Sequence, residues 1–473
     1  MAANTHILQT PLGFPTPVGQ PLMFVVQNTQ TVANELKVKF IAEVFISTEI
    51  INLSLTDDLV GTFKTTPNAE GKGMFDLSNL VDSFVKADNL ASKDGSQFKE
   101  IDSNFSTNRH PVHLIDKFSL SLNTLKYMVI RFSTEALDTS VTPAVVSTVS
   151  GSEVKSQLFL IFNGYLKSTD ALFNTSDNNG FGYDMSRFYL DDNQSHFLTN
   201  APLKQYANID DYGTLSMYAN PQTNIDFTRI KLNYYNSAGV GIGAEAVNKQ
   251  EDNGAWKNYS LNSINEILHF GCYPANLRGW SSVFQAIVTS GTINGGRIDV
   301  QAFDASTEIS LVYSIYVNCP DLKGYESIRL CWINQWGVWD YYTFTKKSTK
   351  TISTKGVTYN QLAGTWNDNR YYPDGFSGGK KTFRVNATEK IQMNTDFVTE
   401  DETVMFEELI NSPEVYILDV FNENDVANLI LNNYVTPARV TTSSFTRKTI
   451  ANDKLMQYTF EVEKSKTLRT QSV

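Results

Sequence analysis

Short runs of Val, Ile, Thr, Phe and Tyr, separated by turn residues, recur along the whole chain and constrain its fold more than any other feature. Between residues 185 and 345, six such runs follow one another, including GTLSMYA, RIKLNYYN and ISLVYSIYVN. β-Branched and aromatic residues suit a pleated, half-buried surface, and turn signals at this spacing are typical of sandwiches and barrels. We therefore predict a mainly β, multi-domain fold with antiparallel β-sandwich-like domains and a few short helices.

The length of the chain predicts several domains rather than one. At 473 residues it is too long for a single hydrophobic core, and with 41% hydrophobic and 19% charged residues it can fold throughout. The best boundary is the segment 170–200, which is rich in Asn, Asp, Gly and Ser, as linkers and long surface loops are. We predict an extended N-terminal lead, a β-sandwich-like domain, a second β-rich domain, and a C-terminal β-rich domain with a short helix. Their predicted ranges are 1–19, 20–170, 171–345 and 346–473.

Two alternating strands are candidates for sheet edges, because each keeps one polar face. They are residues 36–46 and 455–462. The polar stretches 86–112 and 170–200 are longer than the roughly 12–15 residues of ordinary connections. We expect these edges and arms to become ordered on neighbouring copies of the chain or on partner proteins.

Three short helices are predicted within the β pattern. One follows a cap at Asp76 or Ser78, one lies within NSINEILHFGCYPANL (262–277), and one follows Thr399 or Asp401. The remaining regular structure is expected to be strand.

The charge balance argues against nucleic acid as a partner. The formal net charge is −11, and no block of Lys and Arg is dense enough to follow a phosphate backbone. No run approaches the roughly 20 apolar residues of a membrane span, so no membrane contact is expected. The first 26 residues lack a basic region ahead of an apolar stretch, which does not fit a signal peptide. We expect synthesis and folding in a cytosol.

Recognisable catalytic and metal-binding patterns are sparse. Cys272, Cys319 and Cys331 form no C-x-x-C pair and are expected to be free, buried thiols. His110 and His113 lie three residues apart, but a metal needs three or four convergent ligands and no H-E-x-x-H occurs. Without a G-x-S-x-G elbow or a recognisable Cys–His pair, we predict no enzymatic activity, no catalytic or metal-binding residues and no cofactor.

Three loop segments have a superficial likeness to ligand sites. GVGIGAEA (239–246) lacks the Lys-Ser/Thr of a phosphate-binding P-loop and is predicted to be a flexible hairpin tip. DNNGFGYD (177–184) and DDNQ (191–194) offer oxygen ligands but lack the spacing of an EF-hand loop. We interpret them as solvated linkers, with calcium binding as the alternative.

The stretch RLCWINQWGVWDYYTFTKK, residues 329–347, holds three of the six tryptophans. Its alternation predicts a β-hairpin with the turn NQWG, in which Gly337 adopts a positive φ. Most of its aromatic side chains, Trp332 included, are expected in the core. Trp336 is expected at the tip of the hairpin, where Trp and Tyr are favoured anchors of subunit contacts; a platform for stacking a sugar is the other alternative. The candidate partner-binding residues are Trp336, Trp339 and Tyr341.

Packing and turn motifs occur near the start, middle and end of the chain. They are KTTPNAEGKGMFDLSNLV after an N-terminal strand pair, SIRLCWINQWGVWDYYTFTKK, and FEELINSPEVYIL followed by YTFEVEKS. Together they resemble uncharacterised virion structural proteins of tailed bacteriophages, over most of the chain. The resemblance implies a component of the tail, neck or baseplate, assembled in the host cytoplasm and present in the virion in many copies. It carries no functional residues over to this sequence.

The partners implied are other virion proteins and copies of the chain itself. Two alternatives come from other functional classes. A carbohydrate-binding or host-adhesion module would expose aromatic residues such as Trp336 in a shallow groove for a host surface glycan. A glycan-cleaving enzyme would place two carboxylates about 5–10 Å apart in a cleft.

Overall fold

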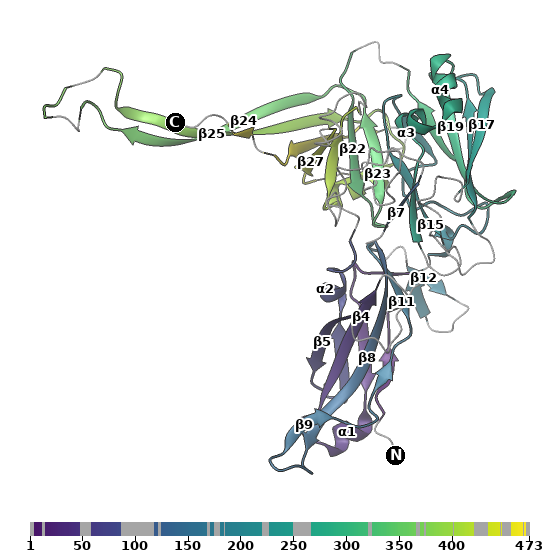
Figure 1. Cartoon of the computed structure of the whole chain (residues 1–473), viewed down its shortest axis with the longest axis vertical. Coiled ribbons are helices and arrows are strands. Elements are labelled where there is room, and N and C mark those ends of the chain that lie inside the picture. The colour runs from purple at the N-terminus through teal and green to yellow at the C-terminus, as the bar shows by residue number, and fades with distance from the viewer. Residues whose placement is uncertain are drawn as a thin grey trace. The chain divides into compact units, whose positions relative to one another are not determined.

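The computed structural model confirms the mainly β fold, with 48% strand and 11% helix. Its described strands form six sheets, most of them antiparallel, and the helices are short (Figure 1). The structure describes residues 4–11, 15–47, 58–86, 118–121, 124–167, 171–174, 180–183, 185–219, 227–248, 266–319, 324–365, 369–372, 375–400, 402–420, 434–444, 446, 456–466 and 468–469.

The chain divides into two compact units. The first unit comprises residues 1–319 and 333–340, and the second comprises residues 320–332 and 341–473. The division therefore falls within the predicted tryptophan hairpin, whose tip belongs to the first unit. The three β-rich domains expected from the sequence, with boundaries at 170 and 345, stay a prediction.

Two sheets in the first part of the first unit share one hydrophobic core, as in a sandwich. Phe24 lies at its centre, with ring centroids 5.8 Å from Phe132 and 5.6 Å from Phe159. Helices α1 (Thr29–Asn34) and α2 (Ser78–Val81) flank the strands, and α2 confirms the helix predicted after Asp76. The sheets consist of β2 (Thr16–Pro17), β11 (Phe159–Phe162), β8 (Leu125–Asp138), β4 (Lys39–Ser47) and β5 (Leu59–Thr65), with β9 (Val145–Thr148) and β10 (Val154–Lys155) on β8, and of β1 (His6–Gln9), β3 (Met23–Gln27) and β6 (Lys72–Asp76).

The predicted sheet edge at 36–46 is wrong. β4 is an inner strand, because β8 pairs with one side of it and β5 with the other. Its second face is not wet either, since Ile41 and Phe45 are buried there. Glu43 remains on that face because Arg131 Nε binds its carboxylate at 2.6 Å. A polar residue in an alternating strand therefore marked a cross-strand ion pair and not an edge.

The later part of the first unit contains two larger sheets, a two-stranded ribbon and helices α3 (Pro274–Trp280) and α4 (Ser282–Thr289). The hairpin tip predicted at GVGIGAEA is only partly present. Gly239, with a φ of 76°, and Val240 lie in the turn, but residues 241–246 belong to strand β17 (Gly241–Asn248) and pair with β16 (Arg229–Tyr235). The ribbon is β12 (Ala171–Asn174) with β13 (Gly180–Tyr183). The sheets are β14 (Lys204–Ala207), β21 (Tyr313–Val317), β19 (Arg297–Asp304), β16 (Arg229–Tyr235) and β17 (Gly241–Asn248), with β20 (Thr307–Glu308) on β19, and β15 (Thr214–Ala219), β18 (Glu266–Gly271) and β7 (Phe118–Ser121).

The helix predicted within 262–277 is only partly present. Residues 266–271 form strand β18, which lies between β15 and β7. Helix α3 begins at Pro274, because proline fits the first turn of a helix but not its interior. The proline thus separates a strand from a helix where the sequence pattern suggested one continuous helix.

The second unit is built on one large sheet. Helix α5 (Thr403–Asn411) packs against it and confirms the helix predicted after residue 399. The predicted edge at 455–462 is wrong for its described part, since β28 lies between β25 and β27. The sheet runs β23 (Trp339–Phe344), β22 (Ile328–Ile333), β26 (Val415–Leu418), β27 (Val435–Val440), β28 (Thr459–Lys464), β25 (Gly379–Asn394) and β24 (Thr349–Gln361), with β29 (Leu468–Arg469) on β25.

The two predicted polar arms have different outcomes. Nearly all of 86–112 lies outside the described residues. Within 170–200, the part from 185 onward is not an arm, because Met185, Phe188 and Leu198 are buried in a core cluster with residues of β4, β8 and β11. These apolar side chains have polar neighbours in the sequence, so the composition of the segment did not indicate that they are buried.

Candidate functional site

The tip of the tryptophan hairpin is the predicted site, and its backbone has the predicted form. Gly337 has a φ of 72°, and Asn334 accepts a hydrogen bond from its N–H at 3.1 Å. The turn lies directly on the segment around Asn163: a Cβ added to Gly337 would lie 1.7 Å from the Asn163 carbonyl oxygen. Tyr165 N–H also donates to the Gln335 carbonyl at 2.9 Å. Only glycine fits a turn that is both left-handed and this closely packed.

The prediction that Trp336 is exposed at this tip is wrong. Its side chain is 1% exposed, and its ring centroid lies 4.4 Å from that of Phe188. The guanidinium of Arg187 lies 5.3 Å from the Trp336 ring and covers both aromatic groups. Trp339 and Tyr341 are also buried, so the three candidate partner-binding residues offer no surface to a partner of the folded chain. Turns usually lie at the surface, but this one is enclosed by segments distant in sequence.

Trp332 is fully buried, as predicted. Its burial and that of Trp336 leave no shallow aromatic groove at this hairpin, which is the arrangement that a sugar-stacking platform would need. The tryptophan cluster is therefore core.

A buried carboxyl group, Asp340, lies beside the same turn in the first unit. It accepts hydrogen bonds from the Thr199 hydroxyl at 2.6 Å and from the Asn334 side-chain amide at 3.0 Å. The Asn334 amide also donates to the Leu198 carbonyl at 3.0 Å. Loss of solvent raises the pKa of Asp340 from 3.8 to about 6, although both hydrogen bonds oppose this shift.

This raised pKa predicts that Asp340 makes folding less favourable as the pH rises. The stabilisation that comes from protonated Asp340 is fully present below pH 3.8, the pKa of this group in the unfolded chain. It is lost once the pH exceeds about 6, the pKa of Asp340 in the folded chain. The free energy of unfolding should thereby fall by up to about 3 kcal/mol. The difference in unfolding free energy between wild type and Asp340→Asn, measured from pH 4 to 7 by urea denaturation, should show this slope. Parallel pH curves for the two proteins would contradict it.

A Ser–His pair and two of the three cysteines lie buried in the described part of the chain. His269 Nδ1 lies 2.8 Å from the Ser216 hydroxyl, but both side chains are 2% exposed, and burial lowers the pKa of His269 to about 3. Cys272 and Cys331 are buried as expected, whereas Cys319 is exposed. This Ser–His pair is inaccessible to a substrate.

The remaining sequence candidates do not converge on a site. Across the described ranges, no group of three His, Cys, Asp or Glu side chains could hold a metal ion. His110, His113 and residues 177–179 and 184 of DNNGFGYD lie outside the described residues, and its residues 180–183 form strand β13. In DDNQ, Asp192 accepts the Gln194 N–H at 2.7 Å and Asp191 accepts the Ser195 hydroxyl at 3.0 Å, as in a local turn. Within the described part of the chain, no helix is long and apolar enough to cross a membrane.

A pocket of about 440 Å³ opens between β4, β5 and β8. Three lysines line it, and Glu135 is the carboxylate among its lining residues. Lys64 Nζ lies 2.5 Å from that carboxylate. Because glycan cleavage needs two carboxylates, this pocket does not fit that chemistry.

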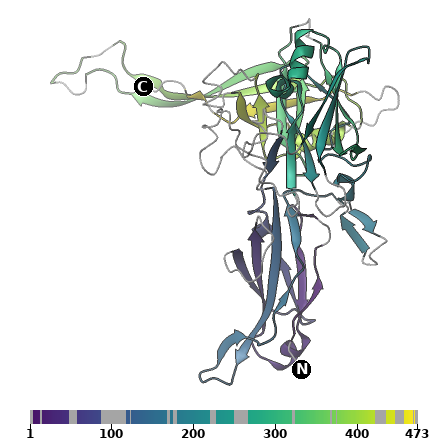
Figure 2. The same cartoon turned by 45° about the vertical axis from the view of Figure 1, so that its right-hand side comes forward.

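The most distinctive surface feature is an arm that the sequence analysis did not predict. Strands β24 and β25 pair over their whole length, from Thr349 opposite Gln392 to Gln361 opposite Gly379. We call these two strands and their connection, residues 349–394, the arm. Both views show the two strands running together beyond the rest of their sheet (Figure 1, Figure 2). The 13 residues of β24 span about 44 Å at 3.4 Å per residue.

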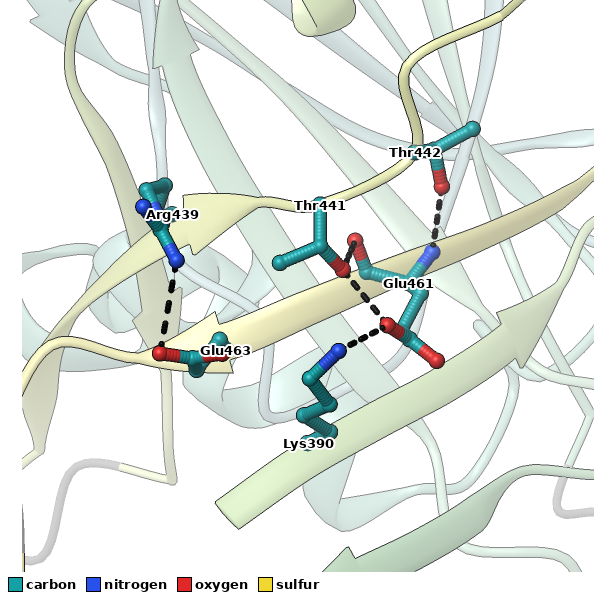
Figure 3. Close-up of polar contacts among 6 residues, drawn as sticks. All are labelled: Lys390, Arg439, Thr441, Thr442, Glu461 and Glu463. Atoms are coloured by element: carbon teal, nitrogen blue, oxygen red, sulfur yellow. Dashed lines mark hydrogen bonds and ion pairs between the residues drawn. The ribbon is translucent and has the colours of Figure 1, made fainter. Parts of the chain in front are cut away.

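The base of the arm is held by charged and hydroxyl side chains, as Figure 3 shows. Glu461 on β28 accepts hydrogen bonds from Lys390 at 2.9 Å and from the Thr441 hydroxyl at 2.7 Å. These two bonds, that from Thr441 first, lower the pKa of Glu461. On the neighbouring strand, Arg439 lies 3.5 Å from Glu463. The bond from Lys390 fixes the arm to β28, and the contacts of Arg439 and Thr441 fix β28 to β27 and the residue that follows it.

The outer part of the arm lacks such support. β25 pairs with β28 through residues 390–394 and with β29 through 386–387, so residues 379–385 pair with β24 alone among the described strands. All residues of β24 up to Thr358 are exposed. A two-stranded ribbon without further cover is at best marginally stable in water.

Large apolar side chains are exposed along the arm. Phe376 is 83% exposed and Tyr371 is 64% exposed. Single exposed apolar residues are ordinary, but a concentration of them on one projecting element is typical of an interaction site. The full set is Ile352, Val357, Leu362, Tyr371, Tyr372, Phe376 and Phe383.

No protein-family model matches the chain, and no curated protein matches it. The arrangement of the residues is therefore the basis for assigning a function. It favours the arm over the tryptophan hairpin as the candidate site.

Proposed function

We propose that this chain is a non-enzymatic structural component of a bacteriophage virion, in the tail, neck or baseplate, that acts through contacts with other virion proteins and copies of itself. The observation that carries the proposal is the arm, an uncovered two-stranded ribbon with seven exposed large apolar residues. Such an element gains stability when a neighbouring protein covers it. The sequence resemblance to virion structural proteins and the series of β sheets support the same assignment.

Mass spectrometry of gradient-purified particles tests this function. The expected result is that the chain is present in several copies per particle, in a fixed ratio to the main structural proteins. The chain would be rejected as a virion component if it remained in the lysate and were absent from infectious particles.

A host-adhesion role is the alternative that one observation favours. Tyr371, Tyr372 and Phe376 lie near the outer end of the arm and are exposed, and aromatic rings of this kind can stack on sugars. A glycan array with the intact chain distinguishes the two roles. Glycan binding that is lost in Tyr371→Ala and Tyr372→Ala, while particle assembly is unchanged, would favour adhesion.

A further inference from the structure

Positive charge is concentrated on the arm of an otherwise acidic protein. Residues 349–394, the arm, contain seven Lys and Arg residues and three Asp and Glu residues, a formal charge of +4, whereas the rest of the chain carries −15. The segment that follows, 395–438, contains ten Asp and Glu residues and neither Lys nor Arg. The two parts of one chain are therefore electrostatically complementary to each other.

Several of the arm's cations are available to a partner. Lys355, Lys380 and Arg384 are exposed and lie on the outer, two-stranded part of the arm. Lys350 and Lys390, by contrast, are engaged at the base with Glu326 and Glu461. Exposed apolar side chains lie next to these cations, since Val357 is opposite Arg384 in the strand register and Phe383 precedes Arg384 in the chain. A surface of this kind fits an acidic partner that also has apolar groups.

We propose that the arm of one copy docks on the acidic body of a second copy of this chain, with residues 395–400 and 402–420 as the receiving surface. This inference rests on the proposed assembly function and specifies one of its contacts. The described part of the segment presents the acidic Glu400 and the apolar Phe397 and Val420 at its surface, so it offers both kinds of group. Arm and body are different surfaces, so the contact either occurs twice in a two-fold dimer that exchanges arms or, made once per pair, builds rings or open arrays.

The test uses the full-length chain in sedimentation velocity, at about 50 mM and about 500 mM salt, where the Debye length falls from roughly 14 Å to 4 Å. Wild type should self-associate, more strongly at low salt. The arm variant Lys355→Glu, Lys380→Glu, Arg384→Glu should associate at least about tenfold more weakly, because like charges then face each other. A matched control, Lys155→Glu, Lys204→Glu, Lys466→Glu, has the same net charge from three exposed lysines outside the arm and should associate like wild type.

A charge exchange makes the test specific for this pair of surfaces. The body variant Glu400→Lys, Glu407→Lys, Glu414→Lys should also associate weakly by itself. An equimolar mixture of arm and body variants should recover association, since an acidic arm then meets a basic body. If a thermal melt shows that one of these variants does not fold, the same positions are changed to glutamine instead, and the measurement is repeated.

Three results would overturn the inference. They are a monomeric wild type at both salt concentrations, an arm variant that associates like wild type, and a mixture that does not recover association. A wild type that retains DNA or RNA through the arm cations, with self-association unaffected, would assign the charge to nucleic acid and overturn it too. The proposed function fails separately, if the chain is absent from particles.

Discussion

Replacing Trp336 with alanine should destabilise the first unit by about 3–5 kcal/mol, the range measured for large aromatic residues in cores. The side chain is 1% exposed and packs on Phe188 and beneath Arg187. Its removal would leave a cavity in a core cluster that also holds residues of β4, β8 and β11. The hairpin tip would then lose the apolar contact that holds it against the first unit.

Trp336→Phe is the matched control for this change. The indole N–H of Trp336 has no hydrogen-bond partner, so phenylalanine removes no bond and keeps most of the ring contact. Hydrogen exchange of first-unit peptides, measured as a function of urea concentration, reports the unfolding free energy of this unit. The decrease in that free energy should be much smaller for Trp336→Phe than for Trp336→Ala. If Trp336→Ala lowered the unfolding free energy by less than about 1 kcal/mol, the hairpin tip would not be packed in this core.

Phe406→Ala should cause a loss of similar size, about 3–5 kcal/mol, in the second unit. Phe406 on α5 is fully buried. Its ring centroid lies 4.9 Å from that of Tyr342 and 5.3 Å from that of Phe460. These contacts attach the helix to strands β23 and β28, so the substitution should loosen α5 and the sheet beneath it.

The nearby Phe397 provides the control, because its side chain is 62% exposed. Phe397→Ala should change the unfolding free energy by no more than about 0.5 kcal/mol, as surface substitutions usually do. Unit-specific peptides in hydrogen exchange are the appropriate probe, since a chain with two units need not unfold in one step. Equal effects of the two substitutions would show that α5 does not depend on Phe406.

The sequence pattern was sufficient to predict those elements whose conformation depends on neighbouring residues in the chain. The NQWG turn was predictable because Gly337 tolerates a positive φ, and the helix at 403–411 because its apolar residues recur at helical spacing. The burial of Trp336 was not predictable, since it depends on Asn163 and Phe188, which are distant in sequence.

The sheet edges and the arm were both predicted wrongly or missed because the pattern of a single strand does not show which strands pair with it. An alternating strand with one polar face reads as an edge, yet β4 and β28 are inner strands whose carboxylates are bound by Arg131 and Lys390 on neighbouring strands. β24, which does end its sheet, has a polar sequence, TKTISTKGVTYNQ, without a clear apolar face. Its partner strand lies beyond a long connection, so the pattern gave no sign of a ribbon. The uneven distribution of Lys and Arg was a signal that could have indicated the arm.

Hydrogen exchange along β24 and β25, in the isolated chain and in the assembled particle, tests most directly the claim that the arm is an assembly contact. Amides of the outer arm, residues 356–361 and 379–385, should exchange rapidly in the isolated chain, because among the described strands they pair only with each other. In the particle they should become strongly protected, while the amides of β28 change little. Equal exchange of the outer arm in both states would contradict the account.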